Sequence, residues 1–453
     1  MTLKSTLACV GVLATACPLH AADDGFDTCL AAMRAEAPRR GVAAETFDRY
    51  TTALEPDFGV VALLDYQPEF VAPIWDYLAA AVDDDRVADG QAMLREWAPT
   101  LRAVEARFGV DPATVVAVWG VESNFGRNFG KRPLVTSLAT LSCFGRRQDF
   151  FRGEFFTTLK ILEEGHVDPA RLTGSWAGAF GHTQFMPSTF TRVAVDFDGD
   201  GRRDLVGSIP DALASTANFL KNAGWNPDQA WGYEVALPGR LDGAPGGRRN
   251  KRPLSEWAAL GVTRVDGTPL DGGPTPAGLL LPAGDPGPAF LVFRNFDALY
   301  SYNAAESYAL AIAHLSDRLR GGGSFTTPWP TDDPPLSRAE RRELQTLLTM
   351  RGYEIGEIDG IVGAATRDAI LDVQCGLGLE PDGRAGGKLL ERLRLDVGST
   401  RIDQPATTPP SGESAPPEPN SRPETDSDPA AASGPASDRE TGAQPGAAAR
   451  DGR

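Results

Sequence analysis

Apolar residues recur at helical spacing through most of the first 320 positions of the chain. This spacing gathers apolar side chains on one face of a helix, which then packs against a core. It predicts helices over residues 25–36, 46–54, 73–81, 88–108, 138–141, 148–162, 210–221 and 304–319. We therefore expect a mainly α domain over residues 23–320, with a core of its own.

The pattern changes between residues 233 and 293, where glycine and proline are frequent. Short runs of β-prone residues at 233–237 and 289–293 predict strands. A basic patch, residues 248–252, lies between them. We expect a small irregular β lobe inserted in the helical domain, which makes the fold class mainly α with an α+β character.

A glycine- and proline-rich stretch, residues 321–335, predicts a linker. After it, residues 336–395 hold an internal repeat, because Asp-Gly-x-x-Gly at 359–363 recurs at 382–386, each time before a predicted helix. We expect a separate small helical domain there. Residues 396–453 contain no aromatic residue and are rich in Pro, Ser, Ala, Glu and Asp, which predicts a disordered tail.

The first 22 residues have the pattern of an export signal: Lys4, an apolar run over 7–19, then small residues before an acidic pair. Cleavage after Ala22 would release the mature chain into the periplasm. A second interpretation remains open, in which Cys17 follows small residues and carries a lipid anchor to the outer membrane. No later segment has 18 consecutive apolar residues, so no membrane-spanning helix is expected.

Loss of the signal would leave three cysteines, Cys29, Cys143 and Cys375. Export to an oxidising compartment favours a disulfide. We favour Cys29 with Cys143, both in the helical domain, and expect Cys375 to be a buried thiol. Three reduced, buried cysteines remain an open alternative.

The net charge of −17 argues against nucleic acid as a partner, because beyond the short basic patch at 248–252 no Lys/Arg-rich block stands out that could neutralise phosphates. The charge balance therefore favours an uncharged ligand, or one bound through a local site.

The strongest candidate for chemistry is Glu122. Asp111 and Pro112 are typical of a helix N-cap and first helical position, and an apolar run over 113–121 follows. Glu122 should therefore lie near the C-terminal end of a buried helix, where desolvation and the helix dipole both raise a carboxyl pKa. A raised pKa suits a general acid. The alternative is a glutamate at a helix end that simply reaches water.

Residues 196–204 form an aspartate-rich loop of EF-hand type. The expected oxygen ligands are Asp196, Asp198, Asp200, the Arg202 carbonyl and Asp204. Gly207 stands where that loop has a glutamate, so Asp211 at the start of the next helix would supply the missing carboxylate. The pattern predicts a structural Ca²⁺, with a polar Asp-Gly turn as the alternative.

Four separated motifs, at 119–126, 174–188, 196–211 and 300–308, occur in this order. Together they resemble the membrane-bound lytic murein transglycosylase B family, a lysozyme-like group of bacterial cell-wall enzymes. The resemblance covers about residues 25–320. The unit at 336–395 resembles a three-helix peptidoglycan-binding domain, so both resemblances imply peptidoglycan glycan strands as the partner. Deleting 336–453 should therefore weaken wall binding more than turnover of soluble fragments.

The resemblance implies that Glu122 is the single catalytic residue. It further implies substrate-binding roles for Tyr77, Ser175, Gln184, Phe219, Tyr302, Asn303 and Tyr308. Thr183 stands where the family has a glycine. Phe219 stands at the position of an aromatic wall residue, and because phenylalanine has no hydroxyl, a tyrosine hydroxyl is missing from one subsite. The aspartate loop matches the family's Ca²⁺ site. We expect no organic cofactor and a monomer, with His166 and His182 in structural roles.

Glycoside hydrolysis normally uses two carboxylates, and the sequence motifs offer only Glu122. The resemblance implies a substrate-assisted route, in which Glu122 acts as acid and then as base and a 1,6-anhydro sugar forms without water. A lysozyme-type hydrolase stays open if Asp149 or Asp65 faces Glu122 at about 5–9 Å. An inactive peptidoglycan-binding scaffold is the third interpretation.

Overall fold

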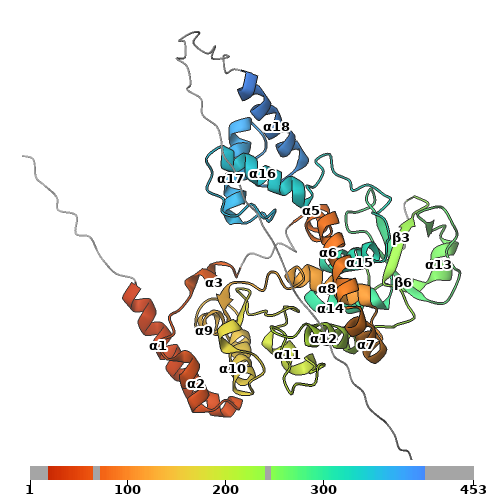
Figure 1. Ribbon diagram of the computed structural model, residues 1–453. Helices are drawn as coiled ribbons and strands as arrows, with labels where there is room; N and C mark the ends of the chain where they lie inside the picture. Colours follow the sequence, from red (N-terminus) through yellow and green to blue (C-terminus); the bar gives the residue numbers. More distant parts are fainter. Residues whose placement is uncertain (1–18, 65–71, 240–245, 403–453) are drawn as a thin grey trace, which may run out of the picture. The chain divides into compact units, whose positions relative to one another are not determined.

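The computed structural model describes residues 19–64, 72–239 and 246–402. The chain up to Leu319 is mainly helical in this description (Figure 1). Its α-helices are α1 (Leu19–Glu36), α2 (Ala44–Thr51), α3 (Phe58–Ala62), α5 (Ile74–Ala81), α6 (Asp84–Glu96), α7 (Ala98–Phe108), α8 (Pro112–Ser123), α9 (Leu134–Cys143), α10 (Gln148–Glu163), α11 (Pro187–Val193), α12 (Ile209–Asn222), α13 (Leu254–Ala259), α14 (Arg294–Asn303) and α15 (Glu306–Leu319). Short 3-10 helices, η1 (Ala37–Arg40) and η2 (Pro169–Arg171), lie between them.

One helix prediction was wrong in extent, and one helix that carries candidate site residues was missed. The helix expected over 88–108 is two helices, α6 and α7, which meet at Trp97. Pro99 lies in the first turn of α7, where its missing N–H is harmless; inside one long helix it would break the hydrogen-bond ladder. The helix α14 was not predicted, and it supplies two of the candidate site residues, Tyr302 and Asn303.

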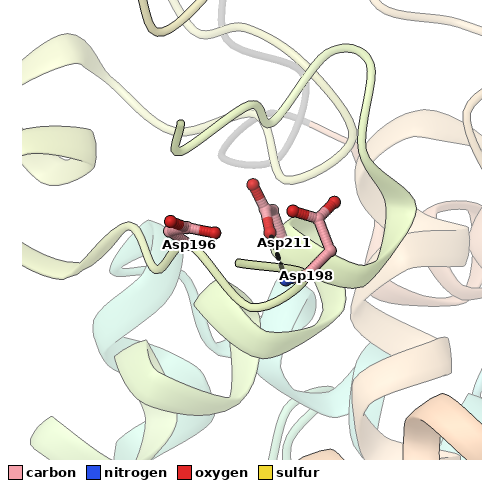
Figure 2. Close-up of side chains that lie close together, drawn as sticks. All are labelled: Asp196, Asp198 and Asp211. Atoms are coloured by element: carbon pink, nitrogen blue, oxygen red, sulfur yellow. Dashed lines mark hydrogen bonds between the residues drawn. The ribbon is translucent and has the colours of Figure 1, made fainter. Parts of the chain in front are cut away.

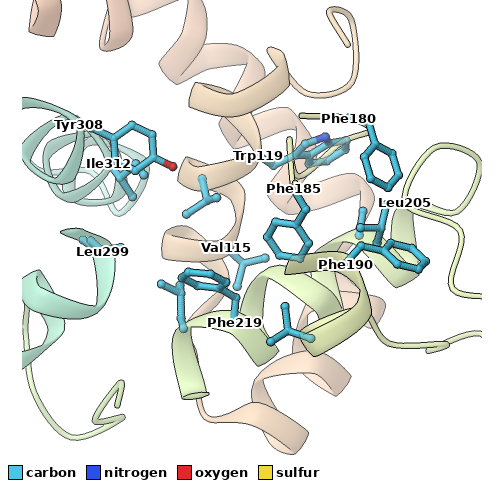
Figure 3. Packing of buried hydrophobic residues seen from close by; sticks show 14 of the residues in the cluster. Val115, Trp119, Phe180, Phe185, Phe190, Leu205, Phe219, Leu299, Tyr308 and Ile312 are labelled. Atoms are coloured by element: carbon cyan, nitrogen blue, oxygen red, sulfur yellow. The ribbon is translucent and has the colours of Figure 1, made fainter. Parts of the chain in front are cut away.

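Helix α8 is the centre of the main core. The Asp111 side chain accepts a hydrogen bond from the Thr114 N–H at 3.0 Å, and Pro112 is the first helical residue, as predicted. Residues 115–118 are fully buried. Figure 3 shows α8, with Val115 and Trp119, between Tyr308 and Ile312 of α15 on one side and the phenylalanines Phe180, Phe185 and Phe190 on the other. A helix that is apolar all round is buried in this way.

The predicted β lobe is a five-stranded antiparallel sheet with the strand order β4-β6-β7-β3-β5. The strands are β3 (Gly232–Ala236), β4 (Arg252–Pro253), β5 (Thr263–Arg264), β6 (Pro276–Leu280) and β7 (Ala289–Val292). Helix α13 covers it, and Trp257 is fully buried in the lobe's own core. A separate pair, β1 (Arg132–Pro133) and β2 (Thr173–Gly174), joins two loops near the end of α8.

The basic patch fastens this lobe to α14. Arg248 lies 3.0 Å from the Asp297 carboxylate, and its guanidinium stacks over the Tyr300 ring at 3.4 Å. Lys251 pairs with the same carboxylate at 2.9 Å. Arg248 and Lys251 are therefore occupied within the fold.

Cys29 of α1 and Cys143 of α9 form a disulfide, the pairing favoured on the sequence, with their Cα atoms 5.9 Å apart. Cys375 was expected to be buried and is exposed instead. Its helix turns Ala369, Ile370 and Val373 toward the core, and Cys375 lies off that face.

The C-terminal unit consists of α16 (Arg338–Met350), α17 (Ala364–Leu377) and α18 (Gly387–Ile402) around a core of its own. The internal repeat is structural. Gln345 accepts a hydrogen bond from the Gly360 N–H at 2.7 Å, and Gln374 accepts one from the Gly383 N–H at 2.8 Å. Each glutamine therefore holds one Asp-Gly turn from the preceding helix.

The tail boundary expected at 396 was wrong, because α18 continues to Ile402; the remaining tail, 403–453, lies outside the described residues. The same is true of residues 1–18, and so of most of the expected export signal and of Cys17, while α1 begins at Leu19. Among the described helices, none is long and apolar enough to cross a bilayer.

The segment expected to be a linker is packed against the helical domain. The Glu234 carboxylate accepts hydrogen bonds from the N–H groups of Thr326 and Thr327, both at 2.7 Å. The Phe325 ring stacks on His314 with ring centroids 4.0 Å apart. These contacts fix the start of the segment, so it does not behave as a free spacer along its whole length.

Candidate active site

Glu122 is the penultimate residue of α8 and is partly exposed. Asn124 ends the helix in the left-handed conformation, with φ 49°. The Tyr308 hydroxyl, from α15, donates a hydrogen bond to the Glu122 carboxylate. Burial, and after it the charge of Glu122, raise the pKa of Tyr308 well above its usual value. Tyr308 therefore stays protonated and remains a hydrogen-bond donor to this carboxylate.

Tyr302 lies beside Tyr308, with the two rings stacked 6.1 Å apart. Its hydroxyl donates to the Thr183 carbonyl at 2.9 Å, which ties α14 to the motif loop 174–188. Burial raises the pKa of Tyr302 well above its usual value, and the charge of Glu122 adds to this. Phe219 is only 9% exposed and packs against Tyr302 at 4.6 Å, so it supports that ring from within the core.

The turn that follows Glu122 is anchored by His182. The Ser123 hydroxyl donates to the His182 carbonyl at 2.8 Å, and the Trp119 indole N–H donates to His182 Nδ1 at 2.9 Å. Burial lowers the pKa of His182 to about 4, so the ring is neutral and Nδ1 can accept. Gly126 has φ +82°, and any Cβ there would collide with this imidazole. His182 thus has the structural role expected, although the sequence did not reveal its partners.

The remaining candidates differ in their surroundings. Gln184, in a left-handed conformation, donates to the Gly181 carbonyl at 2.9 Å and so braces the loop next to Thr183. Ser175 accepts from the Ala179 N–H at 3.1 Å and closes its own turn. Asn303 is exposed at the end of α14.

Tyr77 is half-buried on α5. It is one of the groups that raise the pKa of Tyr308, which places it near the Glu122 group. The structure thus gathers Tyr77, Tyr302 and Tyr308 around Glu122. Phe219 lies behind them. Ser175 forms hydrogen bonds with Gly178 and Ala179 of its own turn.

Of the two acids considered as partners for Glu122, Asp65 lies outside the described residues. Asp149 is an exposed residue of α10 and lines a cavity of about 420 Å³ together with Arg40, Phe150, Glu154 and Lys160. Sequence reasoning missed the buried acid Glu154. Its carboxylate accepts from the Ser188 N–H at 2.8 Å and from the Ser188 hydroxyl at 2.6 Å, so it holds the start of α11.

The aspartate loop brings three of its predicted ligands together. Carboxylate oxygens of Asp196, Asp198 and Asp211 lie within 4.8 Å of one another (Figure 2). Asp211 is fully buried and accepts from the N–H groups of Phe197 at 2.7 Å and Asp204 at 2.9 Å. Burial raises its pKa, and the nearby charge of Asp198 acts in the same direction. A cation would relieve both effects.

The other two predicted carboxylate ligands have different uses. Asp200 accepts from the Arg202 N–H at 2.8 Å. Asp204 accepts from the Val206 N–H at 2.9 Å and the Gly207 N–H at 2.8 Å. Both side chains close local turns of the loop and lie outside the three-carboxylate cluster.

Comparison with known proteins then decides the family. Residues 25–317 match the family model described as a transglycosylase SLT domain. The chain belongs to this family. It is a lytic murein transglycosylase. Residues 337–393 match a second family model, described as a putative peptidoglycan-binding domain.

Individual relatives agree with this assignment. The transglycosylase is 34% identical over 268 residues to membrane-bound lytic murein transglycosylase B of Escherichia coli, covering 58% of this chain and 70% of the relative. It is similar to SltB3 of Pseudomonas aeruginosa, solved with NAG-anhNAM-pentapeptide, at 47% identity and a TM-score of 0.66, covering 82% and 99% of the two chains.

A further solved relative is Escherichia coli SLT35 in complex with calcium, at 29% identity and a TM-score of 0.57, covering 66% and 93% of the two chains. With these likenesses, the mainly helical, lysozyme-like fold class with a small β lobe is confirmed.

Proposed function

We propose that this lytic transglycosylase cleaves the β-1,4 bond between N-acetylmuramic acid and N-acetylglucosamine with Glu122 as its single acid and base. The observation that carries the proposal is the surroundings of Glu122. Its carboxylate accepts a hydrogen bond from Tyr308, and Tyr302 and Tyr77 lie next to that hydroxyl. Glu122 is the carboxylate that acts on both Tyr302 and Tyr308. A lone acid fits a substrate that supplies its own nucleophile.

In the first step, protonated Glu122 gives its proton to the glycosidic oxygen, and the bond to C1 of the muramic acid breaks. The N-acetyl oxygen of that sugar stabilises C1 in place of a second carboxylate. Glu122 then takes the proton of the C6 hydroxyl, whose oxygen bonds to C1 and closes the 1,6-anhydro ring. Glu122 ends protonated again, and no water is consumed. The Tyr308 hydroxyl supports the charged carboxylate between the two steps.

We assign substrate contacts to residues around this acid. Tyr302 and Asn303 end α14, and Gln184 lies in the motif loop next to Thr183, the residue that Tyr302 binds. To this set we add Ser175, which closes its own turn, and Tyr77, which lies near Tyr308. That SltB3 was solved with NAG-anhNAM-pentapeptide supports a glycan with a peptide stem as the ligand.

We propose a structural Ca²⁺ at Asp196, Asp198 and Asp211. Their carboxylates fit the ion, because hard oxygen donors are what Ca²⁺ prefers and three acids this close repel one another without a cation. The calcium in SLT35 supports the assignment. When bound, the ion would hold the loop to α12, and the reaction would not pass through it.

We infer the following division of the chain: an export signal over 1–22, the catalytic domain over 23–320, a linker over 321–335 and a wall-binding domain over 336–395, to which the last turns of α18 add residues up to 402. The family models at 25–317 and 337–393 support the two central parts. We place the mature protein in the periplasm as a monomer, free or anchored by lipid at Cys17. Mass measurement of the native mature protein distinguishes cleavage after Ala22 from a lipidated Cys17.

The test of the proposal is Glu122→Gln, which keeps the shape of the side chain but cannot release a proton. Release of anhydromuropeptides from purified sacculi should fall by at least about a thousandfold, while the variant still sediments with sacculi. Mass spectrometry of the wild-type digest distinguishes anhydro ring closure from hydrolysis. Reducing-end products would refute anhydro ring closure and establish a lysozyme-type hydrolase, and products that persist in the variant would refute the role of Glu122.

A further inference from the structure

The C-terminal unit contacts the catalytic domain at the N-terminal turn of α5. Arg384, in the second Asp-Gly turn, donates from Nε to Asp76 Oδ2 at 2.5 Å and from Nη2 to Asp76 Oδ1 at 2.8 Å. This two-pronged arrangement is the strongest geometry for such a pair. The side chains of Arg384 and Asp76 are only 17% and 20% exposed, so solvent screens the pair weakly.

The opposite end of α5 is also held by arginines. Arg341 of the C-terminal unit is buried and approaches the Ala79 carbonyl with Nη1 at 3.4 Å. Arg86 of α6 donates to the Ala81 carbonyl at 2.7 Å. Cations at the carbonyl end of a helix interact favourably with its dipole. The C-terminal unit therefore contacts α5 at both ends, through Arg384 and Arg341.

Helix α5 needs outside support. It has eight residues, and its N-cap, Pro73, makes no capping hydrogen bond through its side chain. A helix this short is marginal on its own, so tertiary contacts decide where it lies. It packs on α15, the helix of Tyr308, and it carries Tyr77, which raises the pKa of Tyr308.

We propose that Arg384 is a positioning residue for the reaction: through Asp76 it fixes α5, and so places Tyr77 against the Glu122 and Tyr308 pair. The C-terminal unit then acts on turnover as well as on wall binding. This inference rests on the proposed function. It also changes the expectation for the deletion of 336–453, which should lower turnover of soluble fragments together with wall binding.

The experiment uses the full chain with Arg384→Gln, Asp76→Asn and the double variant. Asp76→Asn is the cleaner change, because Arg384 also pairs with Asp333. Each single variant should lower kcat/KM on short soluble glycan fragments by about tenfold, since small misplacements at an active site have effects of this order or larger. The double variant should lose no more than either single one, because both remove the same contact.

A second measurement does not depend on activity. Hydrogen exchange of residues 74–81 should become faster in both single variants, while sedimentation with sacculi stays at the wild-type level. The matched control is Arg342→Gln. Arg342 belongs to the same unit and pairs with Asp85 of α6 at 3.2 Å, but both side chains are largely exposed and neither lies on α5.

Wild-type turnover and exchange in Arg384→Gln and Asp76→Asn would overturn the inference. So would an equal loss in Arg342→Gln, or fully additive losses in the double variant. Thermal unfolding of each variant identifies a global folding defect, and the exchange of 74–81 relative to the rest of the chain then still reports on α5. Failure of the proposed function looks different, because the wild type itself would then release reducing-end products or none.

Discussion

The two carboxylate sites of the catalytic domain, Glu122 and the aspartate loop, use the same functional group in opposite surroundings. Glu122 has protonated tyrosines as neighbours and a neutral histidine, His182, behind its turn. Asp211 accepts backbone N–H groups on both oxygens and has two further carboxylates within 4.8 Å.

The difference teaches how to distinguish a reactive acid from a structural one. A carboxylate that accepts buried backbone N–H groups on both oxygens would weaken those hydrogen bonds on gaining a proton. Glu122 is partly exposed and accepts from a side-chain hydroxyl, that of Tyr308, which can follow a change in its charge. The tyrosines and the histidine around Glu122 are neutral, whereas the crowded charges of the loop favour a cation.

The largest effect should come from Asp211→Asn. The new amide would point an N–H at the N–H of Phe197 or Asp204, so one buried donor would lose its acceptor. The free energy of unfolding should fall by about 4 kcal/mol, and the stabilisation of the wild type by added Ca²⁺ should disappear. Urea unfolding with CaCl₂ or a chelator measures both.

The matched control for this change is Asp200→Asn, whose new carbonyl can still accept from the Arg202 N–H. It should change stability by less than about 1 kcal/mol. If the two substitutions lowered the free energy of unfolding equally, the burial of Asp211 would not make it more important for stability than Asp200.

The next effect concerns the neutral surroundings of Glu122 and depends on pH. The pKa of His182 is about 4 in the folded protein and about 6.5 in the unfolded chain. Between these pH values only the unfolded chain gains a proton at this histidine. The free energy of unfolding therefore has its full value above pH 6.5 and falls by about 3 kcal/mol as the pH drops toward 4. His182→Gln should remove this share of the pH dependence, as measured by urea unfolding at pH 7 and pH 4.

The buried His314 of α15, whose pKa is also about 4, provides a parallel case. His314→Gln should remove a similar share of the pH dependence on its own, because the pKa of His314 is lowered by its own burial. An unchanged slope in His182→Gln would show that this ring is protonated in the folded protein.

The smallest effect should come from Tyr308→Phe, which removes the donor to Glu122 and leaves the packing of the ring. Turnover should fall by about thirtyfold, or about 2 kcal/mol, because a hydrogen bond to a charged group is lost while the acid itself remains. The anhydro product should still form. Tyr302→Phe is the control, since that hydroxyl binds a backbone carbonyl, and it should affect turnover less.

Local sequence signals predicted much of this molecule. Asp111 and Pro112 marked the start of α8, the aspartates marked their loop, and the repeated Asp-Gly turns marked the C-terminal unit. These features depend on residues close together in the chain. Pro99 would also have revealed the break between α6 and α7, had it been read as a helix start.

The missed features depend on distant residues. Arg384 and Asp76 are 308 positions apart, and nothing in either local pattern indicates that they meet. The acceptor for the Trp119 indole was equally invisible, because His182 follows it by 63 positions. A partner for a polar side chain is fixed by packing, and a single sequence contains no direct record of that packing.

The bond between Cys29 and Cys143 has a consequence for how the enzyme is assembled. The two residues are 114 positions apart, and the whole of α8, with Glu122, lies in the covalent ring between them. Closing a ring of this size restricts the unfolded chain by an amount equivalent to about 5 kcal/mol in the chain-entropy model. The segment that carries the acid therefore begins its search for the native state already looped, wherever the thiols have been oxidised first.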